Sequence, residues 1–225
     1  MISFLPEVAR PPNMRLGRHI EHDERSRSYR VVRARQPIAS VRHLRRIPPL
    51  DQGDVGACTG FAGVGMMCTG PHLHDDLGAQ DAIALYSEAS LLDDIPGEYP
   101  PSDTGSSGLA VCKALLLRGW IRSYSHAFSL DDVLNGLQSG PGITGIVWRE
   151  SCDSPNSLGV VRDQGAALGG HEFEIVGFDA TEGLIWFCNS WGADWGAGGY
   201  FAMHLDDYAR ALADAGDATF AEPIG

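Results

Sequence analysis

The sequence predicts an α+β protein whose helices come first and whose strands follow. Its 225 residues are enough for one large domain or for two lobes that share a cleft. Apolar residues follow helical spacing over much of 58–140, whereas short strand-like runs separated by turns fill 142–205. This order indicates a helical lobe followed by a β-rich lobe.

Residues 1–47 are predicted to form a basic N-terminal arm. They contain 11 arginines and 4 acidic residues, show little apolar periodicity, and include one expected short strand at "SYRVVRA" (28–34). The whole chain nevertheless carries a net charge of −12. The arm could bind nucleic acid or lie against its own acidic body. We favour the second alternative and expect no nucleic-acid partner, because the negative chain opposes general affinity for nucleic acid.

Residues 48–130 are expected to form the helical lobe. The segment "CTGFAGVGMMCT" (58–69) has helical spacing in spite of three glycines, each of which costs about 1 kcal/mol relative to alanine in a helix. We expect such a helix to be tightly buried, with the glycines permitting close approach. Further helices are predicted over 79–92 and 109–120, the second of them ended by Gly119.

Residues 131–225 are expected to form the β-rich lobe. A short helix over 129–140, with Ser129 as its N-cap, leads into this part of the chain. By a resemblance that the motifs below carry, the strands are expected to form a twisted antiparallel sheet or barrel. The predicted strands are 142–149, 172–180, 183–191 and 199–205.

Three segments carry the candidate catalytic residues. "DQGDVGACTGFA" places Gln52 six residues before Cys58 at the start of the glycine-rich helix. "GGHEFEIVGFD" places His171 at the head of a strand, and "LIWFCNSWGADWGAGGY" places Asn189 at the end of another. A free thiol, with a pKa of about 8.5, is mostly protonated at neutral pH. A helix N-terminus and a neighbouring imidazolium would both favour its thiolate.

Together these segments resemble the papain family of cysteine peptidases, in the order Gln, Cys, His, Asn and most specifically in "NSWGADWGAGGY". The segment "GACTG" is similar to that of bacterial-type or phage-type members. The resemblance covers roughly residues 50–205. It implies one papain-like catalytic domain with a helical left lobe, a sheet or barrel right lobe, and the active-site cleft between them.

The resemblance also implies the reaction, which is hydrolysis of a peptide bond through an acyl-enzyme. Cys58 would be the nucleophile, His171 the acid and base, and Asn189 the residue that orients the imidazole. Gln52 would stabilise the oxyanion together with the backbone N–H of Cys58. The expected partner is a peptide or protein substrate, with no cofactor.

The expected substrate-binding residues are Glu172, Gly108 and Trp191. By resemblance, Glu172 borders the pocket for the second substrate side chain, where a carboxylate would favour a basic residue. Glu174 lies two residues on, on the same face of the strand. Both carboxylates could equally be solvent-exposed strand positions. Trp191 would shield the bond between His171 and Asn189 from water.

Some features indicate the cellular environment. Val55 stands where secreted members of the family have a cysteine that forms a disulfide, and Thr59 stands where they have a large aromatic residue. No apolar run approaches the ~18 residues that span a bilayer, and "MISFLPEVARPPNMR" does not form a signal peptide. We therefore expect a cytoplasmic or assembly-associated protein with no membrane partner. The sequence does not specify the oligomeric state.

Other interpretations remain open. The same residues could carry out amide or acyl transfer, or the fold could serve as an inactive structural or binding module. The five cysteines are odd in number and lack a CxxC pair, so a disulfide framework is not expected. "HLHDD" (72–76) could bind a metal or form an exposed loop. No metal is expected, because no third histidine or cysteine is placed beside it.

Overall fold

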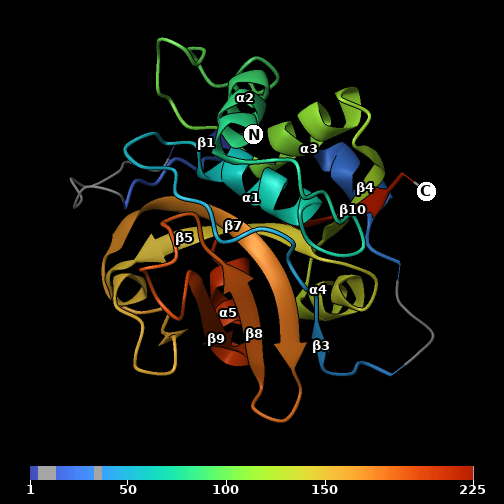
Figure 1. Ribbon diagram of the computed structural model, residues 1–225, viewed down its shortest axis with the longest axis vertical. Coiled ribbons are helices and arrows are strands. Elements are labelled where there is room, and N and C mark those ends of the chain that lie inside the picture. The colour runs from blue at the N-terminus through green and yellow to red at the C-terminus, as the bar shows by residue number, and fades with distance from the viewer. Residues whose placement is uncertain (5–13, 33–36, 225) are drawn as a thin grey trace.

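The computed structural model describes residues 1–4, 14–32 and 37–224. In it, three helices lie against a large twisted sheet (Figure 1). The helices are α1 (Cys58–Met67), α2 (Ala79–Ser90) and α3 (Gly108–Leu117). Their boundaries confirm the three helices that the sequence predicts in this part of the chain.

The glycines of α1 allow the helix to pack unusually closely. Every residue of α1 is buried. A Cβ added at Gly60 would lie 2.3 Å from the carbonyl oxygen of Ala82 in α2, and one at Gly63 would lie 2.6 Å from Val111 in α3. Close packing against two helices therefore offsets the low helix propensity of the glycines.

The sheet contains eight strands in the described part of the chain, and they do not close into a barrel. Its order is β4-β10-β5-β7-β8-β9-β6, with β3 beside β7, and all pairs are antiparallel except β6 with β9. The sheet alternative of the prediction is thus confirmed and the barrel alternative is not. The strands are β3 (Val41–Arg42), β4 (Ile121–Ala127), β5 (Gly142–Arg149), β6 (Val160–Val161), β7 (Ala167–Asp179), β8 (Leu184–Cys188), β9 (Tyr200–His204) and β10 (Asp217–Pro223).

Smaller elements complete the fold. They are the hairpin of β1 (Ile2–Ser3) and β2 (Ile20–Glu21), the helices α4 (Leu130–Leu137) and α5 (Leu205–Ala213), and the 3₁₀ helices η1 (Glu24–Tyr29) and η2 (Glu150–Asp153). The strand predicted at 28–34 is wrong over its first residues. These continue η1, whose first turn is capped by the side chain of Asp23. Residues 33–36 lie outside the described part.

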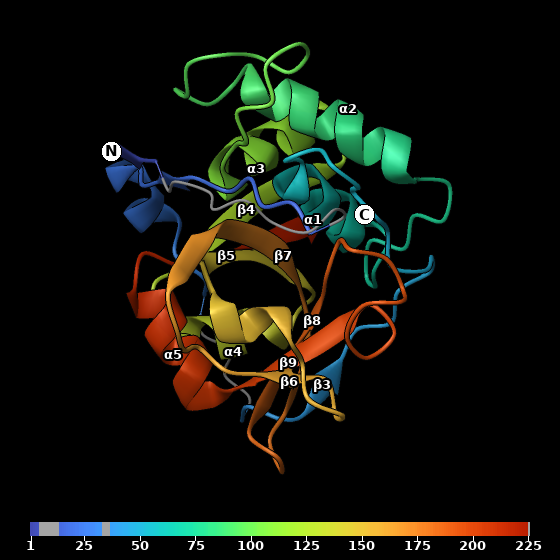
Figure 2. The same ribbon diagram turned by 90° about the vertical axis from the view of Figure 1, so that its left-hand side faces the viewer.

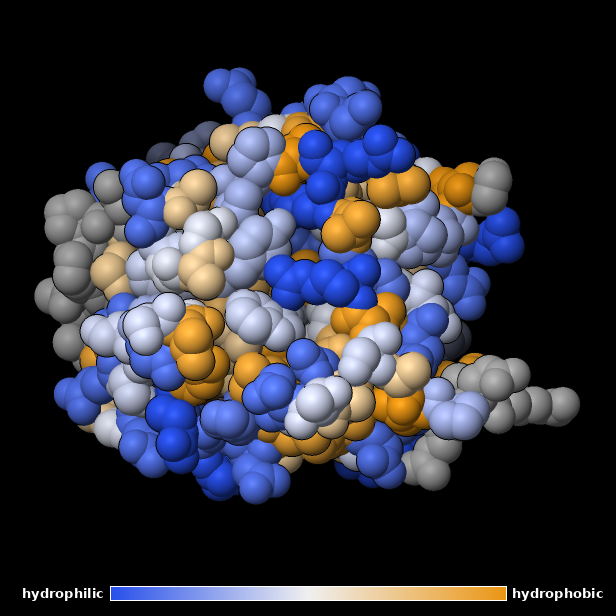
Figure 3. Space-filling model, turned by 60° about the horizontal axis from the view of Figure 1, so that its bottom comes forward, coloured by the Kyte–Doolittle hydropathy of each residue, from blue (hydrophilic) through white to orange (hydrophobic). Residues whose placement is uncertain are grey.

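Two apolar cores lie on either side of the junction between helices and sheet. One fills the space among α1, α2 and α3, and the other lies between the sheet and α4 and α5 around Trp148, Phe173 and Phe201. On the face shown in Figure 3, apolar side chains lie in small groups between hydrophilic ones. No described helix has the length and apolar composition needed to cross a membrane.

The described parts of the N-terminal arm, residues 1–4, 14–32 and 37–47, lie against the body of the protein. Figure 2 shows the blue N-terminal segment running between the helices and the sheet. Its arginines pair with acidic residues of the body, as the second of the two alternatives for the arm requires. The pairs are Arg18 with Asp217, Arg30 with Asp132 and Arg45 with Glu174. The division of the chain at residues 47 and 130 remains a prediction.

Candidate active site

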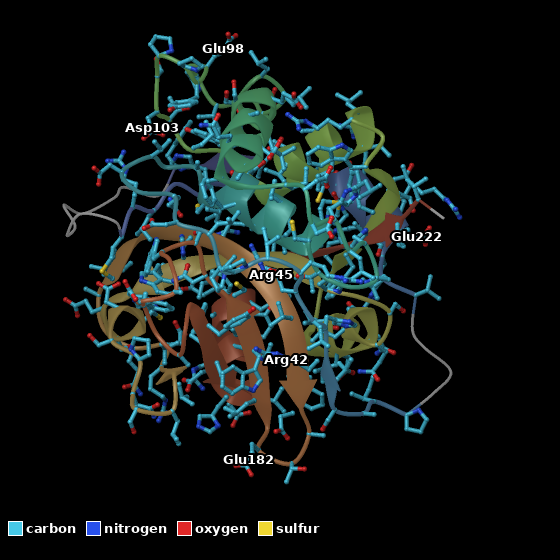
Figure 4. The ribbon with its side chains drawn as sticks, viewed as in Figure 1. Arg42, Arg45, Glu98, Asp103, Glu182 and Glu222 are labelled. Carbon is cyan, nitrogen blue, oxygen red and sulfur yellow. The ribbon has the colours of Figure 1, made fainter. Side chains whose placement is uncertain are left out.

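Cys58 is the first residue of α1, and its side chain is fully buried. The loop before it is held by Asp103, which is labelled in Figure 4. The Asp103 carboxylate accepts hydrogen bonds from the Gly56 N–H at 2.9 Å and from the Tyr86 hydroxyl at 2.8 Å. Nothing in the local sequence around Asp103 shows that it fixes the loop of the nucleophile.

Gln52 forms hydrogen bonds with Ser190, which follows Asn189, and with Val55, which precedes Cys58. Its backbone N–H donates to the Ser190 carbonyl at 2.9 Å, and its side-chain oxygen accepts from the Ser190 hydroxyl at 2.5 Å. Its side-chain nitrogen donates to the Val55 carbonyl at 2.8 Å. The Gln52 amide is therefore fixed between the loop that precedes Cys58 and the residue that follows Asn189.

His171 and Asn189 are brought together by the register of β7 and β8. Glu174 pairs with Cys188, so Asn189, the residue after β8, comes close to the part of β7 that carries His171. The Nε2 atom of His171 lies 2.7 Å from Oδ1 of Asn189, and both side chains are buried. Oδ1 also accepts the Ser190 N–H at 2.8 Å. Since this oxygen only accepts, the hydrogen bond places a proton on Nε2 and directs Nδ1 elsewhere.

Two tryptophans enclose the imidazole of His171. Trp191 stacks on it with ring centroids 4.6 Å apart, and Trp148 approaches edge-on at 5.0 Å. The Trp191 indole N–H donates to the carbonyl of Arg15 in the arm. Trp148 comes from β5, and sequence reasoning missed it because it lies in a strand far from the motif.

The arm joins the loop of Cys58 to the strand of His171. The N–H groups of Gly17 and Arg18 both donate to the carbonyl of Gly170, at 3.1 and 3.0 Å. A Cβ on Gly17 would lie 2.1 Å from the carbonyl oxygen of Gly56, so the arm touches the residues beside both catalytic candidates. Cys58 and His171 are each fully shielded from solvent in this arrangement.

Glu172 and Glu174 are both buried, which overturns the alternative that they are solvent-exposed strand positions. Arg45 pairs with Glu174 at 2.6 Å, and Figure 4 places Arg45 where α1 meets β7. The Arg18 Nε atom lies 3.7 Å from the carboxylate of Glu172. Burial and the Asp217 carboxylate raise the pKa of Glu172 well above its usual value, and Arg18 only partly opposes them.

Gly108 begins α3 and lies against Glu172. A Cβ at this position would lie 2.5 Å from Oε1 of Glu172. The structure therefore brings Gly108 and Glu172 together, and it places Trp191 over the imidazole of His171. The assignment of all three to substrate binding remains a prediction.

The other thiols are chemically unlike a nucleophile. Burial raises the pKa of Cys68, Cys152 and Cys188 to about 12, and raises that of Cys112 well above the usual thiol value. Among the described residues no group of three histidine, cysteine or acidic side chains is arranged to hold a metal ion. In the 72–76 segment, burial lowers the pKa of His72 to about 4.

Residues 138–215 match the family model described as "Papain family cysteine protease". The matched segment contains His171 and Asn189, whereas Cys58 lies before it. No curated protein matches the sequence. The fold is therefore papain-like, and the family match covers the part of the chain that carries His171 and Asn189.

Several solved structures share this fold at low sequence identity. Xylellain, a cysteine protease from Xylella fastidiosa, has a TM-score of 0.60 and 20% identity, with 98% of this chain and 100% of that chain covered. The Carica candamarcensis cysteine protease CMS1MS2 in complex with E-64 has a TM-score of 0.58 and 15% identity, with 84% of this chain and 100% of that chain covered. Digestive procathepsin L 3 of Tenebrio molitor larval midgut has a TM-score of 0.61 and 15% identity, with 93% of this chain and 76% of that chain covered.

Proposed function

We infer that this protein hydrolyses peptide bonds with Cys58 as the nucleophile and His171 as the acid and base. The observation that carries this proposal is the buried bond between His171 Nε2 and Asn189 Oδ1 at 2.7 Å. With Nε2 engaged by Asn189, Nδ1 is the nitrogen that would exchange a proton with the Cys58 thiol. The position of Cys58 at the N-terminus of α1 favours the thiolate, because the helix dipole attracts negative charge there.

In the first half of the reaction, the Cys58 sulfur attacks the carbonyl carbon of the scissile bond. The negative charge then moves to the carbonyl oxygen, where the second N–H of the Gln52 amide and the Cys58 N–H would stabilise it. One such donor contributes roughly 3 kcal/mol to the barrier. As the carbon–nitrogen bond breaks, the proton on Nδ1 of His171 passes to the leaving amine and a thioester remains on Cys58.

In the second half, water attacks the thioester carbonyl and gives a proton to Nδ1 of His171. The carbon–sulfur bond then breaks, which releases the carboxylic acid and restores the pair of Cys58 and His171. Asn189 keeps the imidazole in the required orientation throughout, while Trp191 excludes water from their hydrogen bond.

Alkylation of the thiols tests this proposal, because burial raises the pKa of the other four cysteines. In the Gly17→Ala variant, whose added Cβ does not fit beside Gly56 and so displaces the arm that shields Cys58, we expect iodoacetamide near pH 6 to modify Cys58 selectively, Cys58→Ala to abolish the modification, and His171→Ala to slow it. Peptide mapping identifies the labelled residue. Modification that begins only above about pH 8 would overturn the ion pair. Digestion of a peptide mixture then shows whether water or another amine accepts the acyl group.

A further inference from the structure

A basic segment, "VRHLRRI" (41–47), crosses the surface of the sheet at a distance from the candidate catalytic residues. It contains three arginines and no acidic residue, although the whole chain carries a net charge of −12. Val41 pairs with Phe178 near the end of β7, seven residues after His171 and therefore roughly 23 Å from it along the strand. The segment is thus separate from the site described above.

The side chains of this segment alternate between the surface and the interior. Arg42, Leu44 and Arg46 are exposed, and the exposed fraction of Leu44 reaches 75%. The residues between them are less exposed, and one of these, Arg45, points inward and pairs with the buried Glu174 at 2.6 Å. The outward face therefore offers one apolar side chain between two cations.

The guanidinium of Arg42 lies over two aromatic rings of the sheet. Its central carbon is 5.1 Å from the ring centre of Trp186 in β8 and 4.9 Å from that of Tyr200 in β9. Gly177 stands between Arg42 and Trp186 in the register of three neighbouring strands. A Cβ at Gly177 would lie 3.1 Å from Cδ of Arg42, so the glycine lets this side chain cross β7 to reach the rings.

Neither of the two exposed arginines is neutralised by an acidic neighbour. Arg42 and Arg46 form no ion pair or side-chain hydrogen bond with another residue of the described ranges. Figure 4 shows Arg42 over β7 and β8, and Glu182 away from it at the tip of their hairpin. Burial against the rings lowers the pKa of Arg42. A guanidinium stacked in this way keeps N–H groups at its edge, where they can donate to a carboxylate.

We propose that Arg42, Leu44 and Arg46 form a docking surface for an acidic, extended segment of a partner protein. Two carboxylates of this segment accept hydrogen bonds from the arginines, and an apolar side chain between them covers Leu44. Charge complementarity selects this occupant, because the surface is a basic region on an acidic chain. Nucleic acid fits less well, since its many phosphates would also meet the acidic body, whereas a short segment is screened from charges more than about 10 Å away.

Binding of short peptides to the Cys58→Ala variant tests this surface in the absence of any reaction. The probe is a fluorescently labelled peptide with the core Glu-Ser-Leu-Ser-Glu, and its matched control has glutamine in place of both glutamates. We expect fluorescence anisotropy to show roughly 10-fold tighter binding of the glutamate peptide at low salt, and a smaller difference as salt is added. Equal affinity of the two peptides would overturn the proposal.

Substitutions then locate the binding site. Arg42→Gln and Arg46→Gln should each weaken binding of the glutamate peptide roughly 3- to 10-fold. Arg42→Lys should weaken it nearly as much, because lysine keeps the charge and loses the stacked planar fork. Leu44→Ser should weaken both peptides by the same factor, since both contain the leucine. Arg122→Gln is the matched control, because Arg122 is an exposed arginine on the separate strand β4. If Arg122→Gln weakens binding as much as Arg42→Gln, the attraction is unspecific and the proposal fails.

Two other occupants are outcomes of the same experiments. A single-stranded oligonucleotide that binds more tightly than the glutamate peptide, and loses this affinity in Arg42→Gln, would contradict an acidic polypeptide partner. Self-association in sedimentation velocity that disappears in Arg42→Gln would identify a second copy of this chain as the occupant and would also contradict the proposal. Each variant is compared in urea, so that loss of binding is separated from loss of folding. Because the binding assay does not involve the reaction, its result is independent of the proposed peptidase function.

Discussion

Replacement of Asn189 by alanine should reduce catalysis strongly without abolishing it. The substitution removes one oxygen that accepts two buried hydrogen bonds, from His171 Nε2 at 2.7 Å and from the Ser190 N–H at 2.8 Å. It leaves Trp191 stacked on the imidazole at 4.6 Å and Trp148 against its edge at 5.0 Å. The ring therefore loses its hydrogen bond but keeps most of the contacts that hold its position.

The magnitude follows from these contacts. A hydrogen bond to a charged group contributes about 1.5–3 kcal/mol, which corresponds to a roughly 10- to 150-fold decrease in kcat/KM if the bond acts on the imidazolium. The buried N–H of Ser190 also loses its acceptor, which costs about 1–3 kcal/mol. We therefore expect the free energy of unfolding to fall by roughly 2–3 kcal/mol in total.

The assay is kcat/KM for one peptide substrate, measured beside urea denaturation of the same preparation. Because Asn189→Ala and the unsubstituted protein carry the same arm, any effect of the arm on substrate access cancels in the ratio of their rates. Asn189→Asp is the matched control, since it keeps an acceptor oxygen and should retain more activity. A decrease of less than about 3-fold, or a loss as complete as that of Cys58→Ala, would refute the reasoning.

Three further predictions concern stability and are measured by urea denaturation. Arg45→Ala leaves Glu174 buried without its cation and should lower the free energy of unfolding by about 3–5 kcal/mol. Unchanged stability would mean that Glu174 is neutral. Gly65→Ala places a methyl group 2.6 Å from Arg45 Nη1 and 2.8 Å from Glu174 Oε2, which should cost roughly 1–3 kcal/mol. Burial of Asp132 raises the pKa of its carboxyl group, but the hydrogen bond from the half-exposed Arg30 lowers it. The net result is a pKa below the usual value of 3.8. This stabilisation exists above that pH and is lost as the pH falls. Arg30→Gln should therefore cost about 1 kcal/mol at pH 7 and progressively less as the pH falls below 3.8. A difference that persists in acid would contradict the assignment.

Much of the fold could be predicted because its elements have strong local signals. The strand predicted at 142–149 is β5 with the same boundaries, and α1 begins at Cys58 as expected. The strands β4 and β10 and the helix α5 were not predicted. β10 is inserted between β4 and β5, so its place depends on pairing with residues about 75 to 100 positions earlier in the chain. Local periodicity carries no information about such partners.

The candidate site divides in the same way. Cys58, His171 and Asn189 could be selected as candidates from the sequence, because each stands in a segment whose glycines and flanking residues are distinctive. The residues that hold them could not. Trp148 encloses the imidazole from a separate strand, and Asp103 fixes the nucleophile loop from 47 residues away. Neither has a local pattern that differs from that of an ordinary core or turn residue.

The sequence by itself determined which residues are the candidates for the thiol, the imidazole and the two amides, and in which order they occur. The tertiary structure alone decided that Glu172 and Glu174 are buried, and that Arg18 lies between Glu172 and Asp217. The physical reason is that burial is a property of the assembled sheet and helices. Arg18 in the arm pairs with Asp217, which lies 199 residues later in the chain, so the two meet only in the folded protein.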